Sequence, residues 1–216
     1  MVQSAAQVVM LADGDEVGDL AFALRGGVIR PDYADALWHE LLRCLPWLAD
    51  EPGAGVHPIG GVSEGEGELY LSGRSRLILR LSVDRHPAAR TLIGQNLRLG
   101  SEVAVGQPTL RRLVPSAVLY SAFVSCGPAE ESEFMRVCRE ELAGLGFGNP
   151  RLICGKARRG APVTGEPGEL GGFSLMVHGL NADDSLRLQR TGLGGQRHRG
   201  CGIFVQHKSI VAVDDV

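Results

Sequence analysis

The order of the predicted strands and helices constrains the fold of this chain more than any single motif. Alternating or apolar runs predict strands at 19–24, 56–59, 68–71, 74–81 and 96–105, the last with a bend at Gly100. Residues 8–11 are a further short candidate strand. Helices are predicted from 31 to about 48 and from 87 to 95. Apolar residues at helical spacing define one face of the longer helix: Ala34, Leu37, Leu41, Leu45 and Leu48.

This order, reduced to strand, helix, strand, strand, helix, strand, is ferredoxin-like, and it then begins again. A strand at 117–126, a helix at 131–145 and two strands at 151–156 and 173–180 follow, with a loop at 157–172. A short turn or helix at 185–190 and a strand at 203–207 complete the series. We therefore predict an α+β protein of two tandem ferredoxin-like (RRM-like) units, at 1–113 and 114–216. The remaining length predicts that the second helix of the second unit is short or absent.

A glycine-rich loop precedes the last strand. Its glycines are Gly192, Gly194, Gly195, Gly200 and Gly202, and between them stand Gln196, Arg197, His198 and Arg199. Glycine allows positive φ and close approach of another chain, and the arginine fork suits phosphate, so the pattern favours a loop laid against a polyanion. An ordinary surface loop remains the alternative. The Walker phosphate loop is excluded because Cys201 and Gly202 replace its Lys and hydroxyl residue, and too little chain follows for a dinucleotide-binding unit.

Charge is segregated along the chain. The net charge of -3 argues against a protein that coats nucleic acid over its whole surface. Basic residues nevertheless gather in three segments, at 74–80, 156–159 and 187–199, while acids gather at 13–19, 64–68 and 130–141. This pattern predicts one basic face on an acidic protein. Predicted RNA contacts from these segments are Arg74, Arg76, Arg80, Lys156, Arg158, Arg159, Arg190, Gln196, Arg197, His198, Arg199 and Lys208. For the strand at 74–81, a solvated charged face is the alternative.

The five cysteines are odd in number and form no Cys-x-x-Cys pair, which argues against a disulfide framework or a zinc ribbon. His198, Cys201 and His207 have poor spacing for zinc, so no metal and no cofactor are predicted. No signal peptide and no apolar run of membrane-spanning length are found, and the simplest expectation is a cytoplasmic protein without membrane contact.

His39 is the first candidate catalytic residue. It lies with Asp35 and Arg43 on the polar stripe of the long helix, where no core position requires it. Because histidine titrates near neutrality, it can exchange a proton with RNA, whose own 2′-hydroxyl is the nucleophile in metal-independent cleavage. His57, before Pro58, is a second candidate, and Tyr33 is a third that would orient a base or stack on RNA. The alternatives are an exposed histidine, a structural histidine and a half-buried tyrosine, respectively.

Together, these residues resemble a known family. The loop pattern G-L-G-G-x-R-x-x-G-C-G-x-F at 192–204, the helix at 32–47, and the segments 56–59, 71–77 and 185–193 resemble the CRISPR-associated repeat-RNA endoribonucleases of the repeat-associated mysterious protein (RAMP) superfamily. The likeness is greatest to the subgroup of myxobacterial type I systems and covers about 19–208.

The resemblance implies metal-independent cleavage of precursor CRISPR RNA within each repeat by 2′-hydroxyl attack, giving a 5′-hydroxyl and a 2′,3′-cyclic phosphate. It implies His39 as the base, the glycine-rich loop as a support for the two units and for RNA, and the arginine strand as a grip on the repeat hairpin. The expected partners are the repeat RNA and other subunits of a type I interference complex. A non-catalytic repeat-RNA-binding subunit with the same fold is the alternative function.

Overall fold

The structure is a computed structural model that describes residues 16–30, 32–64, 68–126, 130–159 and 171–207. The candidate strand at 8–11 lies outside these ranges. The first unit contains an antiparallel five-stranded sheet in the order β3-β6-β1-β8-β7. Its strands are β1 (Val17–Arg25), β3 (Gly55–Val56), β6 (Arg76–Ser82), β7 (Asn96–Arg98) and β8 (Glu102–Arg112). Its helices are α1 (Tyr33–Cys44) and α2 (His86–Ala89), with 3-10 turns at Pro46–Asp50 (η1), Val83–Arg85 (η2) and Arg90–Leu92 (η3).

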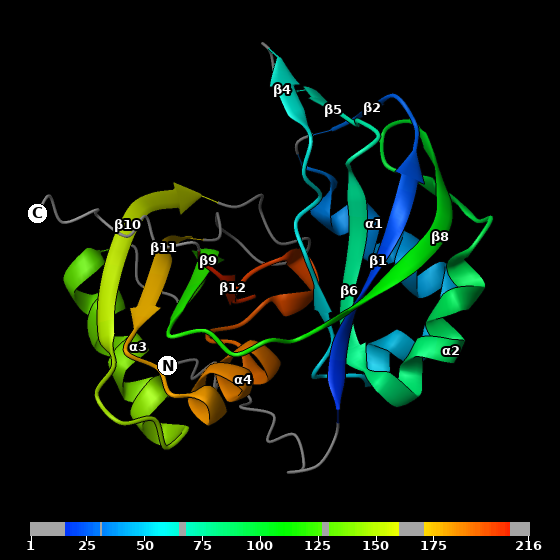
Figure 1. The fold of residues 1–216 in the computed structure, drawn as a ribbon. Helices are drawn as coiled ribbons and strands as arrows, with labels where there is room; N and C mark the ends of the chain where they lie inside the picture. The colour runs from blue at the N-terminus through cyan, green and yellow to red at the C-terminus, as the bar shows by residue number, and fades with distance from the viewer. Residues whose placement is uncertain (1–15, 31, 65–67, 127–129, 160–170, 208–216) are drawn as a thin grey trace, which may run out of the picture.

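Strand order confirms the ferredoxin-like prediction. Without the edge strand β7, the first sheet places the fourth strand beside the first, then the third, then the second. A separate small sheet in the order β2-β5-β4 extends from this unit; its strands are Val28–Ile29, Glu68–Tyr70 and Val62–Glu64. Figure 1 shows it at the top of the molecule, beyond the ends of β1 and β6.

The second unit repeats the same topology with the sheet β10-β11-β9-β12. Its elements in chain order are β9 (Val118–Val124), α3 (Glu131–Gly144), β10 (Arg151–Arg159), β11 (Gly171–His178), α4 (Ala182–Thr191), a 3-10 turn η4 (Arg197–Arg199) and β12 (Val205–Gln206). The second helix is therefore present, with ten residues, and the shortened element is the last strand, with two. Asn181 caps α4 by accepting a hydrogen bond from the amide of Asp184.

Several boundaries differ from the sequence prediction, and for three of them the change affects the course of the chain. The α-helix predicted to 48 ends at Cys44, because Pro46 cannot donate the next helical hydrogen bond, and a 3-10 turn continues the apolar face through buried Leu48. The strand predicted at 96–105 is a hairpin of β7 and β8, since Gly100 has φ +93° and reverses the chain. β10 runs to Arg159, three residues beyond its predicted end.

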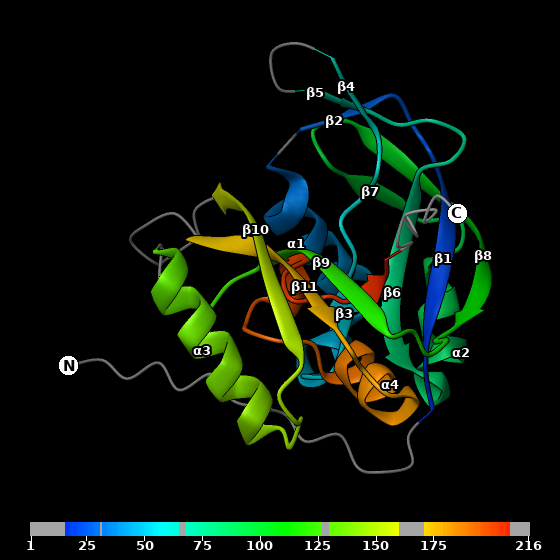
Figure 2. The same ribbon diagram turned by 60° about the vertical axis from the view of Figure 1, so that its left-hand side comes forward.

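Each unit has its own apolar core, one beneath α1 and the other beneath α3 and α4. The two units lie side by side, and the C-terminal segment from α4 to β12 lies between them (Figures 1 and 2). In the first sheet, Leu77 and Leu79 of β6 belong to the core, whereas Arg80 points to the opposite face and meets the second unit. Among the described residues, no helix is both long and apolar enough to span a membrane.

Candidate active site at the junction of α1 and the glycine-rich loop

His39 is exposed on the outer face of α1, as its polar stripe predicts. Its Nδ1 donates a 2.8 Å hydrogen bond to the main-chain carbonyl of Asp35, one helical turn earlier. A carbonyl oxygen can only accept, so this contact places the proton of the neutral ring on Nδ1. Nε2 then carries the lone pair and faces away from the helix backbone. The ring is thereby oriented in the tautomer that a general base requires.

The glycine-rich loop is joined to α1 beside this histidine. Nη2 of Arg199 is 2.7 Å from Oδ2 of Asp35, and the Arg199 side chain is only 4 % exposed. One residue earlier, the imidazole of His198 packs on the indole of Trp38, with ring centroids 4.8 Å apart. Burial and the charge of Arg199 lower the pKa of His198, which keeps the ring neutral against the indole. The second unit therefore contacts the helix turn that carries His39.

Four of the five loop glycines are required by close packing, and Gly195 is the exception. A Cβ on Gly192 or Gly202 would lie within 2.5 Å of a main-chain oxygen of the loop itself, and one on Gly194 would meet the carbonyl of Ser125 at 2.4 Å. Each of these three also has positive φ. The amide of Gly202 donates to Phe123 and that of Gly195 to Ser125, so the loop is fastened to the end of β9. Gly200, at φ +87°, fits against Pro58 beyond β3. The predicted support between the two units thus has a structural basis.

Arg197 is held by main-chain acceptors within the second unit. Its Nη2 donates to the carbonyl of Arg190 at 3.0 Å and its Nη1 to that of Gly202 at 3.5 Å. Burial lowers its pKa to about 10, with a smaller contribution from the nearby charge of Arg80, so the guanidinium stays charged at neutral pH. Its Nε, like that of Arg190, is buried without a hydrogen-bond partner among the described residues. The structure thus gives Arg197 a role in shaping the loop.

Arg80 is the centre of a buried polar network between the units. It is 1 % exposed, and its Nε and Nη2 bind both carboxylate oxygens of Asp19, its cross-strand neighbour, at 2.7 and 2.9 Å. Its Nη1 donates to the carbonyls of Gln189 and Phe204 in the second unit, at 2.9 and 2.8 Å. This placement differs from the predicted RNA contact, because the second unit covers this face of β6. The guanidinium is therefore buried, and its N–H groups donate to acceptors of the protein.

His57 belongs to the same network. It is 8 % exposed, and its Nε2 is 3.4 Å from Oδ2 of Asp19. Burial lowers the pKa of His57 more than the neighbouring Asp19 carboxylate raises it. For Asp19, burial acts to raise the pKa, but the hydrogen bonds from Arg80 and the nearby His57 outweigh it and hold the pKa well below its usual range. In this position His57 lies against the protein interior, and its role as a base stays a prediction.

The remaining predicted residues are dispersed. Tyr33 is half-buried at the start of α1, and its hydroxyl accepts a 2.6 Å hydrogen bond from the amide of Ile59. Burial raises the pKa of this phenol. Arg74 and Lys156 are exposed, and Arg76 is half-buried, donating to main-chain carbonyls of Gly73 and Ser75 in its own turn. Arg158 and Arg159 lie on β10, where they pair with Gly172 and Gly171 of β11. Lys208 lies outside the described residues.

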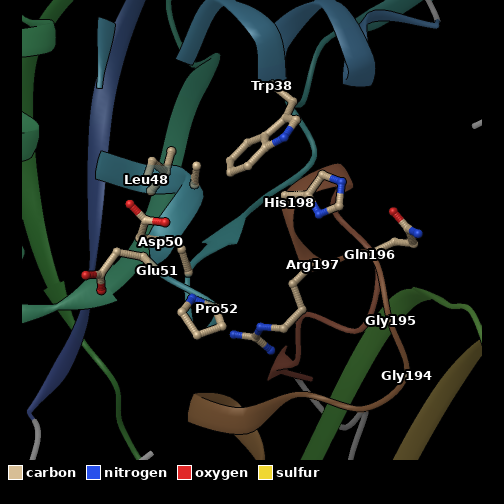
Figure 3. A pocket seen from close by; sticks show the side chains of 12 residues that line it. Trp38, Leu48, Asp50, Glu51, Pro52, Gly194, Gly195, Gln196, Arg197 and His198 are labelled. Carbon is tan, nitrogen blue, oxygen red and sulfur yellow. The ribbon is translucent and has the colours of Figure 1, made fainter. Parts of the chain in front are cut away.

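A cavity of about 670 Å³ opens between the two units beside this junction (Figure 3). One wall comes from Trp38 of α1 and from η1 with the residues after it, and the other from the glycine-rich loop at 194–198. Within the described part of the chain, no group of three or more His, Cys, Asp or Glu side chains is placed to hold a metal ion.

Three residues of the site were not predicted as functional. Asp19 and Asp35 each bind an arginine that the sequence assigned to RNA, and Trp38 forms a cavity wall. The available signal for Asp35 was its position four residues before His39. The available signal for Trp38 was a large aromatic side chain next to the polar stripe of the helix. Nothing in the sequence pairs Asp19 with Arg80, which is 61 residues away.

Comparison with known proteins places this arrangement in a family. Residues 18–209 match the family model described as Cas6 Crispr. The chain is 35 % identical over 189 residues to the CRISPR-associated endonuclease Cas6 of Myxococcus xanthus strain DK1622, covering 87 % of this chain and 80 % of that protein.

Solved structures share the fold. A CRISPR-associated protein Cas6 superposes with a TM-score of 0.60 at 14 % identity, covering 90 % of this chain and 100 % of the other. A RAMP protein described as binding different RNA substrates gives 0.60 at 10 % identity, over 88 % and 98 %. Thermus thermophilus Cse3, bound to an RNA representing a pre-cleavage complex, gives 0.53 at 11 % identity, over 88 % and 98 %. These three likenesses support the fold of two ferredoxin-like units.

Proposed function

The chain belongs to the Cas6 family of CRISPR-associated proteins, and we propose from this that it is an endoribonuclease that binds CRISPR repeat RNA and cleaves precursor CRISPR RNA into guide RNAs. The observation that carries the proposal is the exposed His39, oriented by the Asp35 carbonyl on the helix that the glycine-rich loop contacts. The 35 % identical relative is named an endonuclease, which supports the same activity here.

The chemistry we assign to His39 is proton abstraction from a ribose. With Nδ1 bound to the Asp35 carbonyl, Nε2 accepts the proton of the 2′-hydroxyl. The 2′-oxygen then forms a bond to the adjacent phosphorus, and the bond from phosphorus to the 5′-oxygen breaks. The 5′-oxygen takes a proton from water as it leaves, so the products carry a 2′,3′-cyclic phosphate and a 5′-hydroxyl. No step in this transesterification requires a metal ion.

RNA binding in this proposal rests on the exposed cations. Arg74, Arg76 and Lys156 are open to solvent fully or in part and are the phosphate contacts we propose. Arg158 and Arg159 stay predictions, as does association with further subunits of a type I complex. A repeat hairpin would be read mainly by its shape, phosphates and 2′-hydroxyls, with sequence read at unpaired bases.

The test is cleavage of labelled cognate repeat RNA in EDTA by the wild type and by His39→Ala. We expect the wild type to cut, and the variant to bind with unchanged affinity but to cut at least about 100-fold more slowly, as for loss of a general base. A 2′-deoxy nucleotide at the cleavage site should abolish cutting by the wild type. His57→Gln is the matched control, because it removes a histidine that is buried away from solvent.

Each contrary outcome has a distinct meaning. Unchanged cleavage by His39→Ala together with loss in His57→Gln would move the base to His57. Cleavage that survives the 2′-deoxy substitution would refute attack by the ribose. Tight binding without cleavage by any of the proteins would favour a non-catalytic repeat-RNA-binding subunit.

A further inference from the structure

The cavity between η1 and the glycine-rich loop is unused by the chemistry proposed above. At about 670 Å³ it lies within the size range of small-molecule pockets, and it is lined from both units. Trp38 in its wall is the neighbour of His39 in α1, so the cavity adjoins the helix turn that carries the proposed base. A pocket in this position can select a part of the substrate.

One wall of the cavity is aromatic. The indole of Trp38 is half-buried and projects into the space (Figure 3). The His198 ring is tilted by 40° from it, so the two rings are not stacked in parallel. The Trp38 contact with His198 and the core fixes the indole without burying it completely. Flat aromatic surfaces of this kind bind unpaired bases by stacking.

The same wall also carries acceptors, from the end of η1. Asp50 and Glu51 both line the cavity. Glu51 is ion-paired with Arg85, whereas the exposed carboxylate of Asp50 has no hydrogen bond or ion pair within the described part of the chain. The Arg197 guanidinium also lines the cavity, but it already donates to two main-chain carbonyls, so the Asp50 carboxylate is the charged group left to meet a ligand. A carboxylate accepts hydrogen bonds and suits a neutral group with N–H donors.

The loop side has a residue in an uncommon backbone conformation. Gln196 is the only non-glycine residue with positive φ among the described residues, at 61°. Such a conformation is costly for a side-chain-bearing residue and is found where the surroundings impose it, often at ligand sites. The Oε1 of Gln196 is buried and has no hydrogen-bond partner in the described structure. Figure 3 shows the Gln196 side chain pointing away from Trp38, so this residue shapes the loop side of the cavity through its main chain.

We propose that this cavity binds an unpaired guanine of the repeat RNA, stacked on Trp38 and read by the Asp50 carboxylate. Guanine fits because its N1–H and exocyclic N2–H₂ are adjacent and match the two oxygens of one carboxylate. Adenine and cytosine offer only an amino group beside an acceptor nitrogen, and uracil offers a single N–H. The assignment rests on the proposed function, and it names the base that this site selects.

The experiment measures binding of a non-cleavable 2′-deoxy repeat RNA in which each unpaired guanine is replaced in turn by inosine, which lacks the N2 amino group. One position should weaken binding to the wild type about 10-fold. 7-deazaguanine, which keeps N1–H and N2–H₂, should bind normally there. Asp50→Asn should weaken binding to the unmodified RNA about 10-fold, with no further loss for the inosine RNA. The matched control is Asp84→Asn, which removes the same charge from an exposed residue outside the cavity.

Trp38→Ala should also weaken binding about 10-fold, and Trp38→Phe should retain most of it, with thermal unfolding used to confirm that each variant is folded. Indifference of the wild type to every inosine substitution, with normal cleavage of the unmodified RNA, would overturn the guanine pocket and leave the nuclease intact. Independent, additive losses for Asp50→Asn and inosine would also overturn it. Failure of the wild type to bind or cleave unmodified repeat RNA would overturn the proposed function itself.

Discussion

Replacing Arg80 by methionine tests whether the buried network holds the two units together. The change removes the bidentate partner of Asp19 and the donor to the carbonyls of Gln189 and Phe204. Breaking a buried ion pair by removing one partner costs about 3–5 kcal/mol. Each carbonyl left without a donor adds roughly 1 kcal/mol where water cannot reach it. Because the units can shift slightly to admit water, we expect a net loss of about 4 kcal/mol in the free energy of unfolding.

The measurement is urea unfolding followed by two signals. Tryptophan fluorescence reports the first unit, which contains both tryptophans, Trp38 and Trp47, and far-ultraviolet circular dichroism reports both units. In thermal unfolding, a loss of about 4 kcal/mol in the free energy of unfolding lowers Tm by roughly 8–16 °C for a chain of this length. If the units separate before they unfold, the two signals will no longer coincide in the variant.

Two further variants make the reasoning refutable. Arg76→Met is the matched control, because Arg76 is on the same strand but donates only to carbonyls of its own turn, and it should cost less than about 1 kcal/mol. Adding Asp19→Asn to Arg80→Met removes the uncompensated buried charge and should restore about 2 kcal/mol. A stability of Arg80→Met within 1 kcal/mol of the wild type, or a double variant no more stable than the single one, would refute the account.

Three other predictions concern acid stability and the junction. His57 and Asp19 both have folded-state pKa values below their ordinary values of 6.5 and 3.8, so each favours folding above that value. Stability should fall as pH drops below about 6.5 and again below about 3.8, and His57→Gln should reduce the first fall in a series of urea midpoints, the rest of which comes from His198, whose pKa is also lowered. Gly202→Ala should disrupt the loop and lower Tm by several degrees, since its Cβ would be 2.0 Å from a carbonyl oxygen, while Gly195→Ala, with open space, should not. Arg199→Ala should slow single-turnover cleavage more than it weakens RNA binding, because it frees α1 from the loop; equal effects on both would contradict a positioning role.

The fold was predictable because each element carries a short-range signal. Periods of 3.6 and 2 residues mark the amphipathic helices and strands, and their order alone indicates two ferredoxin-like units, which the strand orders confirm. The errors of the sequence prediction concerned the ends of single elements. Pro46 ended a helix whose apolar pattern continued, and Gly100 turned an apparent strand into a hairpin. In both places the apolar pattern ran on through a change in backbone direction.

The candidate site was less predictable, because a sequence pattern shows which way a side chain faces and not what covers it. Alternation along β6 indicates correctly that Arg80 points away from the core of its own unit. It cannot indicate that the second unit packs there and buries it. The same limit applies to Trp38 and Asp50, whose cavity exists only because the distant glycine-rich loop lies opposite.

The use of arginine within the protein has a consequence for recognition. Arg80 and Arg199 are bound by acceptors across the junction of the two units and Arg197 by acceptors within the second unit, so these three guanidinium groups already have partners in the protein. With a net charge of -3 and fewer free cations than the sequence suggests, non-specific attraction to phosphate is weakened. Discrimination of the repeat from other RNA must then depend more on shape and on contacts with particular bases. A junction built from buried arginines and a cavity lined by carboxylates therefore favours selectivity for one RNA over general affinity for all.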